Sequence, residues 1–207
     1  MVKSSHEREE RQQKKNRMII SGVIIFIMVG STIGFFFGSN SSNNDELEYK
    51  GKNGEKYTFV QSNGQIWITI NGHTLGFYSH PLDAISLNIS DEAKALLTNS
   101  QVFYITFDPN SRDIQYIEQA RFDLEKDFFA LKKYSSSGVS KNSSLYLNYP
   151  IITCANATVY TPVINFIDAN NTDTRGYVNG SCIIFEGKRD DFLRFRDFIV
   201  YRLYGVI

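Results

Sequence analysis

The chain has 207 residues, with 22 Lys or Arg against 22 Asp or Glu, and 42% of its residues are hydrophobic. This length allows one ordinary domain with an appendage rather than two full domains. A net charge of zero argues against nucleic-acid binding, which requires a clustered basic surface. Aromatic residues make up 14% of the chain, so most of it is expected to fold rather than remain disordered.

The N-terminal region combines a short basic tail with a long apolar stretch. Residues 1–17 carry six basic and three acidic side chains, and residues 18–44 carry no charge. A helix over residues 18–38 would cross the hydrocarbon core of a bilayer, which is ~30 Å thick. Phenylalanines at 35–37 stand where signal cleavage needs small residues, so we predict an uncleaved anchor. The basic flank places the tail in the cytoplasm and the C-terminal part outside it.

The predicted anchor carries a row of small residues. Gly30, Gly34 and Gly38 recur every four positions, a pattern that lets two membrane helices approach closely. Self-association through the anchor is therefore one interaction that we expect of this chain. Residues 39–46 form a polar linker, and residues 47–207 form the predicted extracytoplasmic domain.

The domain opens with three short runs typical of strands, over residues 56–61, 65–70 and 74–79. They are separated by Asn63-Gly64 and Asn71-Gly72, and Asn-Gly is the strongest short hairpin signal because both residues tolerate a positive φ. In the middle run, apolar side chains alternate with polar and aromatic ones. The pattern predicts a three-stranded antiparallel meander.

The remainder alternates strands and helices. Ser90, followed by two acidic residues, predicts the N-cap of a helix that ends near Thr98. The Ser-rich stretch at 134–144 predicts an exposed loop and a candidate internal boundary. This order indicates one compact α/β (or α+β) domain with a mixed sheet and about three helices. Further strands are expected over 102–107, 149–154, 159–167 and 182–186, and further helices over 111–133 and from Asp190 or Asp191 to Gly205.

Two features support the extracytoplasmic placement. All six Asn-x-Ser/Thr sequons lie beyond the anchor, where they are candidate glycosylation sites, although an Asn- and Ser-rich loop composition would also produce them. The only two cysteines, Cys154 and Cys182, also lie there, and we predict one disulfide that stabilises the fold by ~3 kcal/mol. Two unrelated buried thiols are the alternative. The sequon asparagines are Asn40, Asn88, Asn142, Asn156, Asn170 and Asn179.

Several segments are similar to small membrane-anchored archaeal proteins that have no assigned activity. They are SQVFYITFDPNSRDIQYIEQARFDL at 100–124, PVINF at 162–166, GSCIIFEG at 180–187 and RDFIVYRLYGV at 196–206. The resemblance would cover most of the external domain and implies a recurrent archaeal surface domain. It supplies no activity, cofactor or site residue.

The best candidates for catalytic chemistry follow the strand predicted at 102–107. Asp108, Arg112 and Asp113 lie between that strand and the next helix, where ligand sites of α/β sheets are often found. Asp-Pro-Asn-Ser is also what a strand-to-helix turn uses for capping, and this interpretation is the stronger one. His73 and His80 lie seven positions apart, and no metal or cofactor site is expected from the sequence.

We therefore expect a single-pass membrane protein that acts in binding or assembly at the cell surface, with an envelope protein as a candidate partner. Trp67, Tyr78 and Tyr160 are candidates for its contact surface. A membrane-tethered hydrolase using acids near Asp108 is the main alternative. A third hypothesis places the domain in the cytoplasm with reduced thiols and unused sequons.

Overall fold

A computed structural model describes residues 46–169 and 173–207, together with Ser21. Apart from Ser21, the predicted tail, anchor and glycine row lie outside the described residues, as do the sequons at Asn40 and Asn170. Within the described part of the chain, no helix is long and apolar enough to cross a membrane. The residues from Asp45 to Ile207 form one compact unit.

The unit begins with a four-stranded antiparallel sheet in the order β1-β2-β3-β4. The three predicted strands are present, and β1, which was not predicted, pairs with β2 along its whole length. Both Asn-Gly turns have positive φ at each residue, 52° and 74° at 63–64 and 51° and 81° at 71–72, as the hairpin prediction requires. The strands are β1 (Glu46–Lys50), β2 (Lys56–Ser62), β3 (Gln65–Ile70) and β4 (His73–Phe77).

The second sheet is mixed and has six strands in the order β5-β9-β10-β8-β6-β7. Strands β10, β8, β6 and β7 run parallel to one another, whereas β9 is antiparallel to β10. The parallel strands end at one edge, where the candidate catalytic residues lie. The strands are β5 (Asn88–Ile89), β6 (Val102–Phe107), β7 (Tyr134–Ser137), β8 (Val163–Asp168), β9 (Arg175–Asn179) and β10 (Cys182–Gly187).

From residue 46 onwards, the described part of the chain has four α-helices beside the sheets. Ser90 caps α3 as predicted, because its hydroxyl accepts a hydrogen bond from the Ala93 amide at 3.3 Å. Helix α2 was not predicted and begins at Pro81, whose fixed φ suits the first turn of a helix. The helices are α2 (Pro81–Ile85), α3 (Asp91–Asn99), α4 (Ile114–Ala130) and α5 (Asp191–Leu203).

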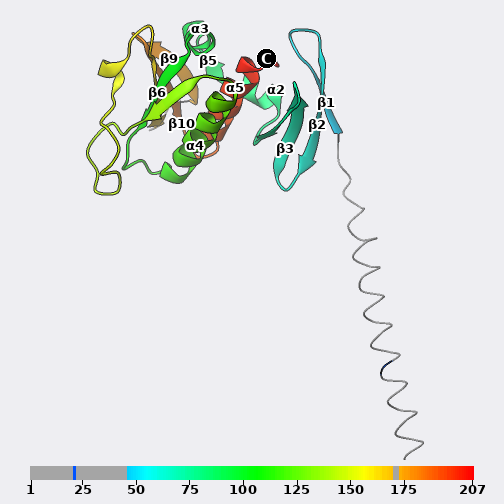
Figure 1. Cartoon of the computed structure of the whole chain (residues 1–207), viewed down its shortest axis with the longest axis horizontal. Coiled ribbons are helices and arrows are strands. Elements are labelled where there is room, and N and C mark those ends of the chain that lie inside the picture. Colours follow the sequence, from blue (N-terminus) through cyan, green and yellow to red (C-terminus); the bar gives the residue numbers. More distant parts are fainter. Residues whose placement is uncertain (1–20, 22–45, 170–172) are drawn as a thin grey trace, which may run out of the picture. The chain divides into compact units, whose positions relative to one another are not determined.

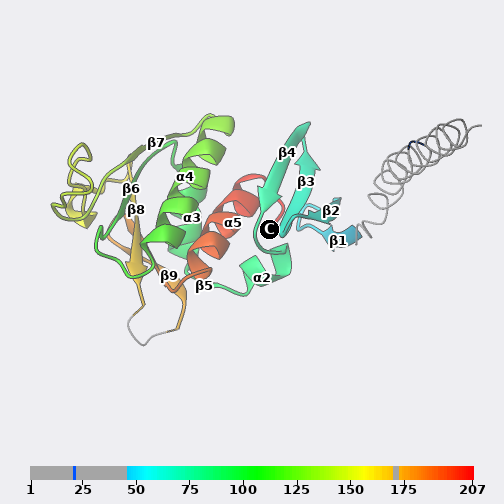
Figure 2. The same cartoon turned by 90° about the horizontal axis from the view of Figure 1, so that it is seen from below.

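Helix α5 lies between the two sheets and joins their cores (Figures 1 and 2). On one side Tyr201 stacks on Phe77 of β4, with ring centroids 3.9 Å apart. On the other side Phe195 packs on Phe185 of β10, with centroids 4.6 Å apart. Nearly every residue from Phe192 to Tyr201 is buried, so both sheets share one hydrophobic core.

The connection between β7 and β8 differs most from the prediction. The strand predicted over 149–154 is wrong, since Ile151 forms only an isolated bridge with Val139 and a 3-10 turn, η1 (Cys154–Asn156), follows. The strand predicted from 159 begins at Val163. Conversely, the first four residues of the predicted 134–144 loop form β7, because the crossover through α4 brings them beside β6. Here tertiary pairing overrides the weak local preference of serine for strands.

Candidate functional site

Asp108 follows β6 at the edge where the parallel strands end. Its Oδ1 accepts a hydrogen bond from the Asn110 amide at 2.8 Å, and its Oδ2 pairs with Lys141 Nζ at 2.8 Å. Burial by itself raises the pKa of this carboxyl, but the Lys141 ammonium and the Asn110 amide outweigh burial and lower it. Asp108 is therefore an anion at neutral pH that stabilises a turn and pairs with lysine.

Arg112 and Asp113 form part of the approach to α4. The Ser111 hydroxyl donates to Asp168 at the end of β8, and the Arg112 amide donates to the same carboxylate at 2.9 Å. Asp113 precedes the helix but makes no side-chain cap, and its Oδ2 instead accepts from the Arg189 amide at 3.1 Å. The contact with Asp168 was not predicted, because Asp168 lies 57 residues from Ser111 in the chain.

This edge is a hydrogen-bonded framework of turns. Asp108, Asp113 and Asp168 each accept from backbone amides, and those bonds hold the start of α4 against the ends of β8 and β10. Within the described ranges, no group of three or more His, Cys, Asp or Glu side chains is arranged to hold a metal ion. The geometry supports the capping interpretation of Asp108 more directly than a catalytic one.

The two histidines lie in separate environments. His73 is exposed at the start of β4. His80 caps α2, with Nδ1 accepting from the Leu82 amide at 3.3 Å, and its ring makes edge contacts with Tyr49 and Phe59. Burial lowers the pKa of His80, and the nearby Asp83 only partly offsets this effect. His80 therefore serves as a neutral packing and capping residue.

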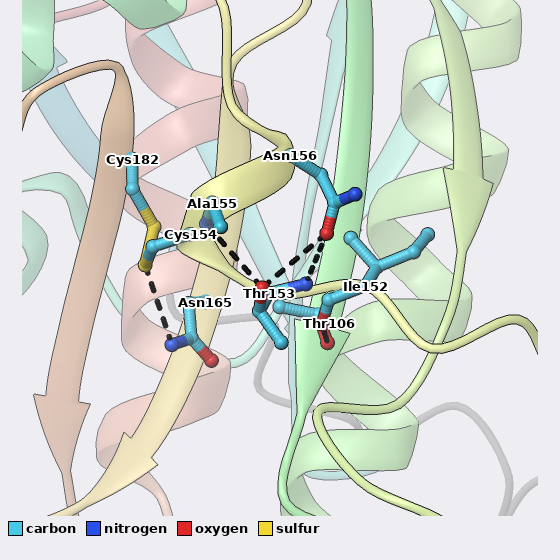
Figure 3. The surroundings of a disulfide bond; sticks show 8 residues. All are labelled: Thr106, Ile152, Thr153, Cys154, Ala155, Asn156, Asn165 and Cys182. Carbon is cyan, nitrogen blue, oxygen red and sulfur yellow. Dashed lines mark hydrogen bonds between the residues drawn. A yellow bond between two sulfur atoms is a disulfide. The ribbon is translucent and has the colours of Figure 1, made fainter.

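The predicted disulfide between Cys154 and Cys182 is present (Figure 3). It joins η1 to the first residue of β10, with Cα atoms 5.2 Å apart. Thr153 and Asn156 form a capping box around η1, in which Asn156 Oδ1 accepts from the Thr153 amide at 2.8 Å. A buried hydrogen bond of 2.6 Å from Thr106 Oγ1 to the Ile152 carbonyl fastens the same segment to β6.

The disulfide holds a segment over the face of the six-stranded sheet that the helices leave uncovered. Ile152 packs there against Val163, Cys182 and Ile184 in a small cluster separate from the main core. The segment thus replaces a layer of secondary structure on this face. Because it is fastened by a disulfide, a capping box and a hydrogen bond to β6, its outward side chains are held in a defined place.

Within the described residues, four sequon asparagines can be placed. Asn88, Asn142, Asn156 and Asn179 are all exposed, on β5, the β7–β8 connection, η1 and the end of β9. In Figure 3 the amide nitrogen of Asn156 points away from Thr153, so the atom that would carry a glycan is free of the capping box. Exposure is compatible with glycosylation at each of these four positions.

A buried ionic cluster was not predicted from the sequence. The Arg196 guanidinium lies 2.6 Å from Asp127 and 2.8 Å from Asp197, and it also donates to the Gly76 carbonyl at 2.7 Å. Burial raises the pKa of both carboxyls, to about 6 for Asp197, against the opposing effect of Arg196. The only sequence signal was the Arg196-Asp197 pair, which interrupts the otherwise apolar run from Phe195 to Tyr201 in α5.

The same cluster fixes the chain between β4 and α2. Asp197 Oδ2 accepts from the amides of Tyr78 and Ser79 at 2.8 and 2.7 Å, and from the Ser79 hydroxyl at 2.9 Å. The Tyr78 hydroxyl donates to Asp123 at 2.6 Å, which makes Tyr78 half-buried rather than an exposed contact residue. An open hollow of about 610 Å³ lies beside Tyr78, Ser79 and His80.

Comparison with known proteins identifies no relative of this chain. No protein-family model matches the chain, and neither the curated proteins nor the solved structures contain a match.

Proposed function

We propose that this chain is a single-pass membrane protein whose domain from residue 47 onwards lies outside the cytoplasm and acts in binding or assembly rather than catalysis. The N-terminal pattern of a basic tail followed by an uncharged apolar stretch supports the anchor and its orientation. The exposed sequons and the fastened outer segment of the domain support a role at the cell surface.

The disulfide is the observation that carries this proposal. Both cysteines of the chain are joined, and the bond closes a loop with a sequence separation of 28. Such bonds persist in oxidising compartments and are rare in the cytosol of most organisms. A structural disulfide that fastens a segment with little secondary structure of its own therefore favours an extracytoplasmic location.

The environment of the candidate acids favours binding over hydrolysis. A general acid needs a pKa near the working pH, whereas the Asp108 pKa is lowered and its oxygens are engaged by Lys141 and the Asn110 amide. Asp113 and Asp168 likewise accept backbone hydrogen bonds that hold α4 in place. These contacts show that each of the three acids stabilises the local backbone.

Cysteine labelling on intact cells tests the proposed topology. Cys182 is buried, so two reporter variants serve better than the native pair: Ala130→Cys at the exposed end of α4, and Ser5→Cys in the tail. With a membrane-impermeant maleimide, Ala130→Cys should react on intact cells and Ser5→Cys only after lysis. The native pair should react only after reduction and denaturation.

The reverse labelling pattern would contradict the proposal. If Ser5→Cys reacts on intact cells and Ala130→Cys does not, the domain lies in the cytoplasm. If the native cysteines react after denaturation without reductant, the disulfide is absent in cells. Extraction of the chain from membranes by carbonate alone would contradict the integral anchor.

A further inference from the structure

The β7–β8 connection presents an uncharged and partly apolar surface. No residue between Lys141 and Asp168 carries a charge, in a chain of which 21% is charged. We call residues 142–162 the uncharged loop. Leu145 and Leu147 are each 83% exposed, and the loop lies at the end of the domain opposite β1 in both views (Figures 1 and 2). Charge depletion with exposed apolar side chains is the composition of an interface core.

Packing explains why these leucines point outward. Tyr146, which lies between them, makes edge contacts with Phe107 and Tyr149, with ring centroids 5.5 Å apart in each case. Tyr149 in turn lies under the Arg121 guanidinium, 5.7 Å from the ring centroid. Because the tyrosines anchor the loop to the domain, the flanking leucines are held in solvent rather than exposed by chance.

The loop also carries a hollow beside its projecting side chains. A cavity of about 350 Å³ is lined by Val139, Tyr146, Leu147 and Tyr149, with Asn142 and two serines at its side. Leu145 does not line this hollow. The same short segment therefore presents both an apolar projection and an apolar recess.

We propose that a second copy of this chain docks on the uncharged loop, with Leu145 of each copy entering the hollow of the other. A twofold contact requires a surface that is complementary to itself, and an uncharged surface with a projection and a recess meets that requirement without like-charge repulsion. A partner of either charge would gain no ionic complementarity from this loop.

The proposed anchor favours the same occupant, so this part of the argument rests on the proposed function. Copies anchored in one membrane are confined to the same surface, which raises their effective concentration for pairing with one another. A lipid surface is the less favoured occupant, because the loop has no Lys or Arg to pair with anionic lipid headgroups.

The docked arrangement has a consequence for one sequon. Asn142 lines the hollow, so a glycan on its side chain would fill the space that Leu145 of the other copy occupies. Asn142 is therefore expected to be unmodified in the paired protein. Asn88 lies on β5, away from the hollow, and its modification is compatible with pairing.

Photo-crosslinking in the full-length chain in its own membrane tests the contact. A benzoylphenylalanine replacing the exposed Asn148 should yield a crosslinked dimer on illumination, and the attachment should map to residues 139–149 of the other copy. Mixing isotopically light and heavy chains identifies bonds between copies. Leu145→Asp should reduce the yield at least about tenfold, because a charge would enter an apolar recess.

Phe129 provides a matched control, since it is 81% exposed but lies at the end of α4. Phe129→Asp should leave the crosslink unchanged. Four results would each overturn the proposal. Two concern the variants: an unchanged yield for Leu145→Asp, or an equal loss for Phe129→Asp. The other two are a crosslink to lipid or to a different protein, and a glycan on Asn142 in the paired protein. Cysteine labelling tests the topology separately from the crosslink. If labelling shows inverted topology but the crosslink between copies is retained, only the proposed function is refuted.

Discussion

Arg196 is a charged side chain that is almost wholly enclosed by protein. Its guanidinium bonds to Asp127 on α4, to its neighbour Asp197, and to the Gly76 carbonyl on β4. Removing one partner from such a group leaves an uncompensated buried charge, which typically costs about 3–5 kcal/mol, a large part of the roughly 5–15 kcal/mol by which domains are stable. The cluster therefore fixes how α4, α5 and β4 meet.

The Asp197 carboxyl predicts a specific dependence of stability on pH. Its pKa is about 6 in the folded chain because burial disfavours the charge, and about 3.9 in an unfolded chain. Between these values the folded state holds a proton that the unfolded state has lost. The contribution of Asp197 to the free energy of unfolding is therefore fully present below about pH 4 and is lost as the pH rises through 6.

Urea denaturation of the wild type and Asp197→Asn at pH 4 and pH 7 measures this contribution. Relative to the variant, the wild type should lose on the order of 2–3 kcal/mol between the two pH values. Asp91→Asn is the control, because the Lys94 side chain lowers the pKa of this exposed carboxyl and the pH trend should have the opposite sign. A pH-independent difference for Asp197→Asn would contradict the assignment.

Gly76 and Trp67 contact each other across strands β3 and β4, on the outer face of the four-stranded sheet. A Cβ added at Gly76 would lie 3.1 Å from both Cη2 and Cζ3 of Trp67, so the indole ring covers this glycine. Gly76→Ala should destabilise the domain by about 1–2 kcal/mol through overpacking. In a Trp67→Ala background the same change should be neutral or stabilising, because alanine loses less backbone entropy on folding. A double-mutant cycle by thermal denaturation checks this reversal, and equal effects in both backgrounds would refute the contact.

At the scale of elements, the disulfide takes the place of regular structure in the β7–β8 connection. Replacing both cysteines by alanine should lower the free energy of unfolding by about 3 kcal/mol, because the unfolded chain regains the freedom of the closed loop. Hydrogen exchange should quicken most over residues 151–162, where the segment opens locally. The core amides of both sheets should lose protection only by the drop in global stability. The reduced wild type is the control and should match the variant; unaltered stability would mean that the capping box and packing hold the segment without the bond.

The elements that were predicted correctly carry their own local signals. The two Asn-Gly turns define β2, β3 and β4, Ser90 starts α3, and the apolar run at 102–107 forms β6 as expected. Strand β9 was missed because Arg175–Asn179 contains only two adjacent strand-forming residues, Tyr177 and Val178, and its pairing depends on β10 and β5. Local pattern finds an element only where that pattern, rather than a distant partner, decides its structure.

In the candidate site, too, only the contacts between residues close in the sequence could be predicted. The capping interpretation of Asp108 followed from the turn residues around it, and the Asn110 amide that it accepts from lies two residues away. The partner of Arg112, by contrast, is Asp168, 56 residues further along the chain. The disulfide was predictable because only two cysteines exist. The Arg196 cluster was not, since its acids come from two helices that a sequence does not place side by side.

For the whole molecule, the central position of α5 predicts a single cooperative unfolding transition. Phe77→Ala removes the ring that stacks on Tyr201 and should cost about 3–5 kcal/mol. Because α5 serves both sheets, peptides from β3 and β10 should lose hydrogen-exchange protection at the same denaturant concentration. Tyr134→Ala, on the exposed edge strand β7, is the control and should shift neither. Protection that persists in β10 after β3 has opened would indicate two independently folding halves.

The outer strands of both sheets bear on how these domains behave when they are crowded together. Strand β5 has only two residues, β7 has four of which three are serines, and β1 carries charged residues at Glu48 and Lys50. The fourth outer strand, β4, has its Gly76 carbonyl bonded to Arg196. Long, flat and apolar edges recruit further strands and lead to fibrils, whereas short or charged edges resist such addition. A dense array of this protein would therefore resist fibril growth by strand addition at these edges.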